Sequence, residues 1–402
     1  MSVIGIIAEY NPFHNGHMHQ IKKALEKFPN KPIVCVMSGN FVQRGEPAIF
    51  DKHVRTRAAL MGGADMVIEL PVMFATASAE YFSHYAVSIL SALGVVDYLC
   101  FGSEEGSSTI LDKIADVLVA EDYGFRAELR ARLAEGKSYP AAREAAVLNI
   151  LPEAVGVIDK PNNILGIEYI KALKRLNSAI IPFAIKREGE GYHSGDYTKE
   201  LSSAKAVRAA LRMGIEEPPG VPDIVKSVYA DAVNRRDFHD IDNLSDILSY
   251  IVKTKPPQYL AEIMDVDEGM HNAIVDVFGR ERLLSEAAKR LKSKRYAHTR
   301  IMRALLHILL AVRKDEFTEF YERGPRYIRV LGFRKNSEYL FSEITSSATL
   351  PLLTNLKNYR EILCPLGIKL IEKEIMATDI YNLTGTKAMP KNAEFREPIV
   401  IL

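Results

Sequence analysis

The chain has 402 residues, of which 48% are hydrophobic and 26% are charged, with 52 Lys and Arg against 51 Asp and Glu. This composition is typical of a globular protein with a sizeable core, and it excludes a disordered chain, a collagen-like chain and a disulfide-rich scaffold. The net charge of +1 implies no polyanionic partner for the chain as a whole, so any nucleic-acid surface must be a local patch.

The cysteines and the N-terminus indicate the compartment. Cys35, Cys100 and Cys364 form no Cys-x-x-Cys pair, which predicts a reducing cytosol and no zinc or other metal site. Cys35 and Cys100 stand in apolar runs, and we interpret them as buried core thiols rather than nucleophiles. No apolar run approaches the length of a transmembrane helix, and a strand pattern begins at Val3, so we expect no membrane anchor, no signal peptide and a cytoplasmic protein.

Short apolar segments alternate with helical patterns along the first half of the chain. In chain order, the patterns predict a strand at 3–8, a helix at 17–28, a strand at 32–37, a helix at 54–61, a strand at 65–70, a helix at 77–93, a strand at 95–101, helices at 109–118 and 164–176, and a strand at 179–185. This alternation predicts βαβ units around a parallel sheet, and therefore an α/β fold. The charged helical stretch at 121–155 indicates an insertion packed on the sheet domain.

The pattern changes after a short segment rich in proline. Residues 216–222 carry three prolines and a glycine, which is typical of a linker. The chain beyond it is mostly helical to about residue 310, and 328–333, 369–370 and 399–402 could add short strands. We therefore predict an α/β domain over residues 1–217 and a mainly helical domain over residues 218–402.

The strongest local signal is His14-Asn15-Gly16-His17, which follows the first predicted strand and opens a helix. Two histidines three residues apart lie on one side of the first helical turn, and the glycine lets a phosphate approach the backbone. Imidazoles in this position can donate hydrogen bonds to phosphate oxygens as charge develops between the α- and β-phosphates. The alternative is a pair of ordinary loop histidines, which the strand–loop–helix context disfavours.

A second signal, Ser202-Ser203-Ala204-Lys205-Ala206-Val207-Arg208, follows the fifth predicted strand and begins another helix. The two serines could cap this helix and bind phosphate, while Lys205 and Arg208 supply positive charge. Lys205 and Arg208 are three residues apart, so both can face one site. The alternative is a plain capped amphipathic helix.

These two elements resemble the HxGH and Ser/Thr-rich signatures of the nucleotidylyltransferase and class I aminoacyl-tRNA synthetase superfamily. The runs at 5–17, 37–48, 63–71, 101–104, 161–169 and 294–296 are more specific, and in this order they resemble the bacterial tRNA(Met) cytidine acetate ligase family over nearly the whole chain. The resemblance implies a Rossmann-like sheet with a C-terminal helical tRNA-binding domain. It implies an enzyme that activates acetate with ATP as acetyl-adenylate, releases pyrophosphate, and acetylates N4 of the wobble cytidine of elongator tRNA(Met).

The same resemblance implies the residues of the nucleotide pocket. His14, His17, Ser203 and Arg208 would stabilise the phosphate charge. Asn162 or its neighbour Asn163 could cap the helix that follows, and Asn163 as the cap would leave Asn162 free for a ligand. Mg²⁺ could accompany ATP, although no carboxylate cluster in the sequence requires it. The implied ATP-binding residues are Ile7, Ala8, Glu9, Tyr10, Asn11, Pro12, Phe13, His14, Asn15, Gly16, His17, Met18, His19, Gln20, Gly102, Asn162, Arg187 and Glu188.

Two further segments have open interpretations. The glycine-flanked polar loop at 38–45 could close over acetate or the tRNA base, or it could be purely structural. Lys52, His53, Arg55 and Arg57 on the next predicted helix could steer RNA phosphates or form a solvated face.

A basic stretch near residue 295 is the best RNA-binding candidate. Seven cations occur there without an acidic residue: Lys289, Arg290, Lys292, Lys294, Arg295, Arg300 and Arg303. Cations track phosphates and aromatic rings can stack on unpaired bases, so we predict Lys294, Arg295, Tyr296 and Arg300 as RNA-binding residues. The alternative is a solvated face.

Two rival functions stay open at this point. A small-molecule nucleotidylyltransferase is disfavoured because such enzymes are commonly much shorter. A non-catalytic RNA-binding protein with a vestigial nucleotide fold is disfavoured because His14, His17 and Arg208 are all present. No obligate protein partner is evident, and the sequence does not identify the residues that contact acetate.

Overall fold

The computed structural model describes residues 2–187, 202–235, 238–293, 296–385 and 389–402. Within this part of the chain, eight strands form one sheet in the order β10-β8-β5-β2-β1-β6-β7, with β9 paired to β8. β3 (Phe41–Val42) and β4 (Glu46–Pro47) form a separate hairpin. The strands of the sheet are β1 (Val3–Ala8), β2 (Ile33–Ser38), β5 (Met66–Leu70), β6 (Val96–Ser103), β7 (Ile181–Lys186), β8 (Ile328–Phe333), β9 (Leu352–Leu353) and β10 (Val400–Ile401).

The centre of the sheet is parallel, as the alternation of strands and helices predicts. β1 pairs in parallel with β2 on one side and with β6 on the other, so that Gly5 lies opposite Val34 and Leu99. The chain runs outward from β1 through β2 to β5 and then returns to add β6 and β7 on the other side. The strand order therefore reverses between β1 and β6, and the carboxyl ends of these strands form the crevice where open α/β sheets bind ligands.

The C-terminal segment returns to this sheet. β8 pairs antiparallel to β5, with Met66 opposite Phe333, and β10 pairs in parallel with β8. The strands expected at 328–333 and 399–402 are thus present, whereas 369–370 lies inside a helix. The sheet is mixed, and its strands come from both sides of residue 217. The sheet is therefore not confined to the residues before the boundary predicted at residue 217. The remaining C-terminal elements are η3 (Lys335–Ser337), α17 (Glu338–Ser347), α18 (Tyr359–Ile362), α19 (Pro365–Asn382) and η4 (Ala393–Phe395).

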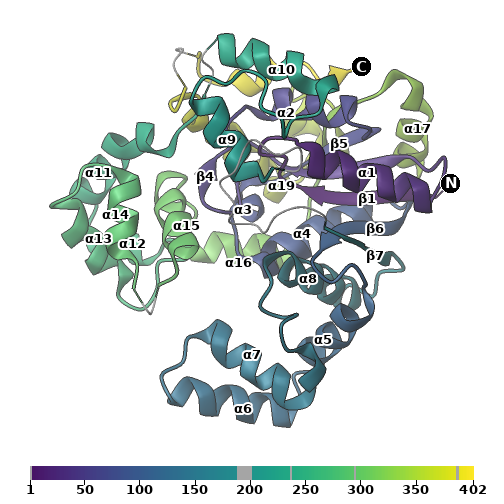
Figure 1. Ribbon diagram of the computed structural model, residues 1–402. Helices are drawn as coiled ribbons and strands as arrows, with labels where there is room; N and C mark the ends of the chain where they lie inside the picture. Colours follow the sequence, from purple (N-terminus) through teal and green to yellow (C-terminus); the bar gives the residue numbers. More distant parts are fainter. Residues whose placement is uncertain (1, 188–201, 236–237, 294–295, 386–388) are drawn as a thin grey trace.

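Helices cover both faces of the sheet (Figure 1). Strand side chains alternate between two cores, so that in β2 Cys35 packs on one face while Val34 and Val36 pack on the other. Cys35 and Cys100 have no exposed surface, and burial raises the pKa of Cys35 to about 12, which confirms them as core thiols. One face is covered by α1 (Asn15–Lys27), α2 (Lys52–Met61), α9 (Ala204–Arg212) and α10 (Asp223–Asn234), and the other by α3 (Val72–Ala75), α4 (Ala79–Ala92), α5 (Thr109–Ala120), α8 (Pro161–Arg175) and α19.

A helical lobe, residues 241–323, lies beside the sheet (left in Figure 1). Its helix α15 also reaches the sheet domain, because Nε2 of the buried His307 lies 3.1 Å from the hydroxyl of Thr76. His307 is therefore a core histidine. The lobe consists of η2 (Ile241–Leu244), α11 (Ser245–Thr254), α12 (Pro257–Ala261), α13 (Met270–Phe278), α14 (Leu284–Leu291), α15 (His298–Leu309) and α16 (Lys314–Arg323).

The insertion at 121–155 forms a helical hairpin of α6 (Tyr123–Ala134) and α7 (Tyr139–Ile150). The two helices pack on each other and extend away from the sheet at the bottom of Figure 1, with contacts to α5 and η1 (Pro152–Ala154) rather than a place on the sheet. Tyr123, the first residue of α6, is 89% exposed. No helix among the described residues combines the length and the apolar character needed to cross a membrane.

The proline-rich segment before α10 is packed rather than free. Its Pro218 and Val221 are buried. The backbone and side-chain amides of Asn15 donate hydrogen bonds to the carbonyls of Gly220 (2.9 Å) and Pro219 (3.1 Å). The segment predicted to be a linker is thereby attached to the first turn of α1.

Two cations of α2 are fully buried, which corrects the expectation that they face RNA or solvent. The guanidinium of Arg55 donates to the carbonyls of Glu9 (2.6 Å), Ser38 (3.0 Å) and Phe50 (3.0 Å), and to that of Gly39. Glu9 and Gly39 lie in the loops that follow β1 and β2, Ser38 is the last residue of β2, and Phe50 lies in the turn before α2. Arg55 therefore joins the two loops at the carboxyl edge of the sheet.

Lys52 lies in a buried cluster of carboxylates. Its Nζ is 2.6 Å from Oε1 of Glu69 on β5 and 3.9 Å from Oε1 of Glu374 on α19, and it also pairs with Glu394 of η4. Arg329 on β8 pairs with Glu394 at 3.2 Å. The attraction of these carboxylates outweighs burial and keeps the pKa of Lys52 above its usual value, so the lysine is charged and links the C-terminal segment to the sheet.

We predict that Arg55→Met lowers the free energy of unfolding by about 3–5 kcal/mol, because several buried carbonyls lose their donor and each costs about 1–3 kcal/mol. Urea denaturation measures the loss. Arg57→Met on the same helix is the matched control, since Arg57 is exposed, and we expect a change within about 0.5 kcal/mol. Equal losses in the two variants would contradict the role given to Arg55.

Candidate active site

A cavity of about 670 Å³ lies at the carboxyl ends of β1 and β6, between α9 and the start of α15. It therefore occupies the crevice at which the strand order reverses. Its walls come from the β1–α1 loop, the β3–β4 hairpin, β6, α8, α9 and the helical lobe. The residues that line it include Ile7, Ala8, Glu9, Tyr10, Asn11, His14, Gly16, His17, Gln20, Gln43, Arg44, Glu46, Phe82, Phe101, Gly102, Glu104, Asn162, Leu165, Tyr169, Arg187, Ser202, Ser203, Lys205, Arg208, His298, Thr299 and Met302.

His14 and His17 form the N-terminal cap of α1. Nδ1 of His14 accepts the amide of Gly16 at 3.0 Å, and Nδ1 of His17 accepts the amide of His14 at 3.2 Å. The rings are stacked, with their centroids 3.7 Å apart. A Cβ atom at Gly16 would press against the His14 ring at Cε1, so the glycine is needed for the cap as well as for ligand approach.

The cap fixes the protonation of both rings. Because each Nδ1 accepts a backbone amide, the proton of each neutral imidazole is on Nε2, which is then a hydrogen-bond donor. Burial lowers the pKa of His14 to about 3, with Arg187 and Arg208 adding to the effect. The pKa of His17 lies well below its usual value for the same main reason. At neutral pH the site therefore presents two uncharged imidazole donors.

The second motif faces the first across the cavity. Ser203 caps α9 by accepting the amide of Ala206 at 3.2 Å, which confirms the predicted cap. Arg208 donates to the carbonyl of Asn11 at 2.7 Å, and its other nitrogen lies 3.4 Å from Oε1 of Glu46. The amino ends of α1 and α9 thus meet at one cavity, and both favour a negatively charged ligand.

The far end of the cavity is formed by β6 and α8. A Cβ atom at Gly102 would touch the side chain of Arg187, so the glycine leaves room beside it. Glu104 caps α8: its Oε1 accepts the backbone (3.3 Å) and side-chain (2.6 Å) amides of Asn162, and its Oε2 accepts the amide of Asn163 (2.9 Å). Neither asparagine is the cap, which corrects both alternatives drawn from the sequence. Asn163 is buried, and Asn162 lines the cavity.

Most of the predicted site residues meet at this cavity. The first loop contributes Ile7, Ala8, Glu9, Tyr10, Asn11, His14, Gly16, His17 and Gln20, and Gly102, Asn162, Arg187, Ser203 and Arg208 complete the set. Pro12, Phe13, Asn15, Met18 and His19 do not line it: Phe13 is fully buried beside Tyr10, and Asn15 holds the proline-rich segment. Glu188 lies outside the described residues.

Several lining residues have no local sequence signal. Phe82 on α4, Tyr169 on α8 and Met302 on α15 follow ordinary helical apolar patterns, and only the fold brings them to the cavity. Glu104 is the first residue after β6 and belongs to the run at 101–104, which is the clue that marks it. Core packing and cavity lining use the same residue types, so such residues need the structure for their assignment.

The polar loop at 38–45 forms part of the β3–β4 hairpin, and it brings the helical lobe to the cavity. Gly45 has φ 77°, and a Cβ atom there would overlap the backbone of Met302 and Arg303 on α15. Gln43 beside it donates its amide to Oε1 of Glu9 at 2.8 Å. The hairpin therefore contacts α15 and the first loop at once.

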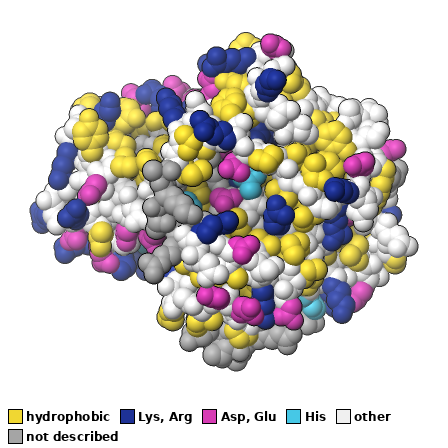
Figure 2. Space-filling view, turned by 90° about the horizontal axis from the view of Figure 1, so that it is seen from above, with side chains coloured by type: hydrophobic (Ala, Val, Ile, Leu, Met, Phe, Trp, Pro, Cys, Tyr) yellow, Lys and Arg dark blue, Asp and Glu magenta, His cyan; other side chains and the backbone are white. Residues whose placement is uncertain are grey.

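Most of the described cations of the basic stretch in the lobe are paired with acidic residues. Its cations pair with acidic residues from other turns: Lys289 with Glu286 (2.6 Å), Arg290 with Glu281, Arg300 with Asp267 (3.3 Å) and Arg303 with Asp265 (3.0 Å). Figure 2 shows basic side chains intermixed with acidic and apolar ones over the visible face of the molecule.

The predicted RNA-binding residues of this stretch have different outcomes. Tyr296 is 8% exposed and donates its hydroxyl to the carbonyl of Glu268 at 2.7 Å, so its ring is not available to stack on a base, which corrects that expectation. Lys294 and Arg295 lie outside the described residues. A role of Arg300 in RNA binding stays a prediction.

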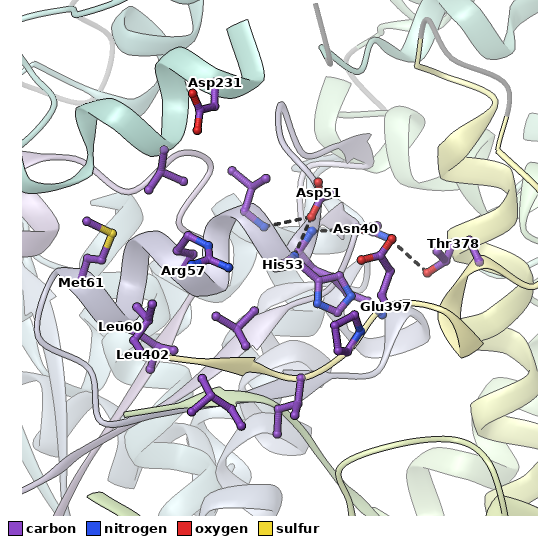
Figure 3. Close-up of a pocket in the computed structure, with 18 of the residues that line it drawn as sticks. Asn40, Asp51, His53, Arg57, Leu60, Met61, Asp231, Thr378, Glu397 and Leu402 are labelled. Atoms are coloured by element: carbon purple, nitrogen blue, oxygen red, sulfur yellow. Dashed lines mark hydrogen bonds between the residues drawn. The ribbon is translucent and has the colours of Figure 1, made fainter. Parts of the chain in front are cut away.

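A second cavity, of about 1520 Å³, lies away from this site, between α2, α10 and the C-terminal tail (Figure 3). Asn40, Asp51, His53 and Thr378 gather on one side of it. Asn40 donates to Thr378 at 3.0 Å and accepts the amide of Lys52 at 2.9 Å, so these polar groups are used in the fold. The two histidines of the first motif and the serines of the second are absent from its described lining.

The chain is similar to characterised families over its full length. Residues 1–395 match the family model of HIGH Nucleotidyl Transferase. The tRNA(Met) cytidine acetate ligase of Thermoanaerobacter sp. (strain X514) is 40% identical over 407 residues, covering 100% of both chains. The tRNA(Met) cytidine acetate ligase of Halothermothrix orenii is 38% identical, covering 95% of each.

Solved structures also match the chain over its full length. Apo TmcAL of Thermotoga maritima superposes with a TM-score of 0.95 at 30% identity, covering 100% of both chains. TmcAL of the same organism bound with alpha-thio ATP superposes with a TM-score of 0.94 at 31% identity, also over 100% of both chains.

We predict that the folded state loses stability as the pH falls from about 6.5 toward 4.5. The unfolded state takes up a proton at His14 in this range, whereas the folded state does not, because the pKa of His14 is about 3 when folded. His14→Asn keeps a capping side chain and removes this titration, so its free energy of unfolding should fall less steeply, by about 1 kcal/mol per pH unit. Urea denaturation at several pH values measures both slopes, and parallel curves would contradict the buried neutral imidazole.

Proposed function

The chain belongs to the HIGH nucleotidyl transferase family and, within it, to the tRNA(Met) cytidine acetate ligases, and we propose that it joins acetate to tRNA with ATP as the activating substrate. In the first half-reaction, acetate attacks the α-phosphorus of ATP, giving acetyl-adenylate and pyrophosphate. In the second, N4 of the wobble cytidine of elongator tRNA(Met) attacks the acetyl carbon and AMP leaves. The observation that carries this proposal is the pair of neutral imidazole donors at the point where the strand order reverses.

The geometry suits the first half-reaction. When acetate attacks, negative charge builds on the α-phosphate and on the departing pyrophosphate. Nε2 of His14 and Nε2 of His17 would donate to this charge, and the guanidinium of Arg208 and the Ser203 end of α9 would lie on its other side. Fixed donors of this kind stabilise a transition state because they need no reorientation as charge develops.

We assign the nucleoside part of ATP to the β6 end of the cavity. Gly102 leaves space beside the strand, and Asn162 and Arg187 border that space. Any Mg²⁺ would travel with the phosphates, because no group of three or more His, Cys, Asp or Glu residues in the described chain is arranged to hold a metal. A magnesium requirement therefore stays a prediction.

The cavity wall that lies opposite the first loop favours a large molecule as the acceptor of the acetyl group. His298, Thr299 and Met302 of the helical lobe line the same cavity as the first motif. A second substrate that enters there meets the lobe before it reaches the activated acetyl group. This arrangement favours a macromolecule such as tRNA over the small acceptor of a short nucleotidylyltransferase, and we place the reaction in the cytoplasm, where tRNA is found.

We predict that His14→Ala slows acetate-dependent ATP–pyrophosphate exchange by about 10²-fold or more, because a preorganised donor is lost. The exchange should proceed in the wild type without tRNA. His271→Ala on α13 is the control, since His271 is remote from the described lining of the cavity, and it should leave the rate unchanged. A folded His14→Ala variant with wild-type exchange would remove His14 from the mechanism.

The tRNA surface is tested by reversing two charges of the basic stretch, Lys294→Glu with Arg295→Glu. If both residues contact phosphates, the slope of log K against log salt should become shallower by roughly 0.7–0.9 for each lost contact. Pyrophosphate exchange should survive, because it does not require tRNA. The control pair is Lys357→Glu with Lys369→Glu, two exposed lysines outside the described lining of the cavity. Filter binding across a salt series that gives equal slopes for wild type and variant would leave the tRNA surface elsewhere.

A further inference from the structure

Among the described residues, three carboxylates line the active-site cavity, and those of Glu9 and Glu46 each have one oxygen without a hydrogen bond to a described residue. Both oxygens of Glu104 accept amides at the start of α8, and Glu46 pairs with Arg208. Oε1 of Glu9 accepts the amide of Gln43 at 2.8 Å, and its Oε2 has no hydrogen bond to a described residue. The fold uses both oxygens of Glu104, and Glu46 faces the guanidinium of Arg208. Glu9 is the carboxylate that a backbone amide fixes while its second oxygen stays available to a substrate.

Glu9 is held in place from both ends. Arg55 donates to its carbonyl at 2.6 Å, and the Gln43 amide holds its side chain. Burial raises the pKa of Glu9, and Glu46 adds to this, while the Gln43 amide, Arg44 and Arg208 act against it. The hydroxyl of Tyr169, on α8, is the other titratable group in its surroundings. The carboxylate is therefore fixed and is more basic than an exposed glutamate.

The second half-reaction needs such a group. The lone pair of N4 in cytidine is delocalised into the ring, so the amine is a weak nucleophile. When N4 attacks the acetyl carbon, positive charge grows on the nitrogen until a proton leaves. A positioned base that removes this proton typically raises the rate of such a step by roughly 10²–10⁴-fold.

Resting on the proposed function, we propose that Glu9 accepts the proton from N4 of the tRNA cytidine during acetyl transfer. The C–N bond forms between N4 and the acetyl carbon. The bond between that carbon and the bridging oxygen breaks, and its electron pair leaves with AMP. The proton moves to the Glu9 carboxylate and then to solvent, so the carboxylate is regenerated.

The other basic groups at the cavity are less suited to this role. The lone pairs of Nδ1 in His14 and His17 are occupied by backbone amides, and their Nε2 atoms carry protons. Lys205 is exposed on the first turn of α9, where it is less enclosed by the cavity than Glu9. His298, the first residue of α15, is the one rival on the opposite wall.

The test uses Glu9→Gln, which keeps an oxygen to accept the Gln43 amide and removes the ability to take a proton. Single-turnover transfer from acetyl-adenylate to tRNA should fall about 10²-fold or more beyond any loss of pyrophosphate exchange with acetate and without tRNA, because the base acts in transfer alone. In the wild type the transfer rate should decline at acid pH as Glu9 becomes protonated, and this decline should be absent from the variant. His271→Gln on α13, outside the described lining of the cavity, is the matched control and should transfer at the wild-type rate.

The outcomes separate this inference from the function on which it rests. A wild-type protein without acetate-dependent exchange would overturn the proposed function, and the inference with it. If the wild type performs both half-reactions, normal transfer by Glu9→Gln would overturn the inference alone. Equal loss of both half-reactions in Glu9→Gln would also overturn it, because a structural or nucleotide-binding role affects both. Loss of transfer in His298→Gln but not in Glu9→Gln would assign the proton to His298.

Discussion

The buried guanidinium of Arg55 is the interaction on which the active-site edge of this protein depends. It donates to carbonyls in the loop after β1 and in the loop after β2, and so keeps two segments at a fixed separation. One of these segments leads into the histidine cap of α1, and the other leads into the β3–β4 hairpin. A guanidinium has five donors in one plane, so a single side chain can hold several loop carbonyls that have no strand partner. The positions of His14, Glu9 and Gln43 all follow from this arrangement.

The neighbouring cluster around Lys52 attaches the C-terminal segment to the sheet in a similar way. Glu69 lies on β5, Glu374 on α19 and Glu394 on η4, so one lysine joins the end of the chain to the middle of the sheet. A buried charge of this kind is costly unless its partners are in place. The return of β8 and β10 to the sheet and the pairing of these charges therefore support each other. The helical lobe is in turn positioned by α15, whose backbone lies against Gly45 of the hairpin.

The sequence predicted the residues that bind phosphate better than the buried residues that hold the surrounding loops and helices in place. Two histidines and a glycine at a strand–helix junction, and a serine with an arginine at another, are identifiable because phosphate chemistry needs these residue types at that spacing. The burial of Lys52 and Arg55 could not be predicted. Charged residues on a short helix give the same sequence pattern whether they face solvent or pair with a residue that is distant in the chain. Glu104 caps a helix that begins 57 residues later in the chain, and no local pattern contains that relation. Tyr296 was misjudged for the same reason, since its partner Glu268 lies on another loop.

We propose that a single cavity of this protein both activates acetate and delivers it to a tRNA cytidine. The most direct measurement incubates the purified full-length chain with ATP, carbon-13-labelled acetate and elongator tRNA(Met), and then analyses the nucleosides of the tRNA by mass spectrometry. We expect N4-acetylcytidine that carries the label, formed together with equal amounts of AMP and pyrophosphate. Release of AMP and pyrophosphate without labelled N4-acetylcytidine would contradict it, as would label at any other nucleoside.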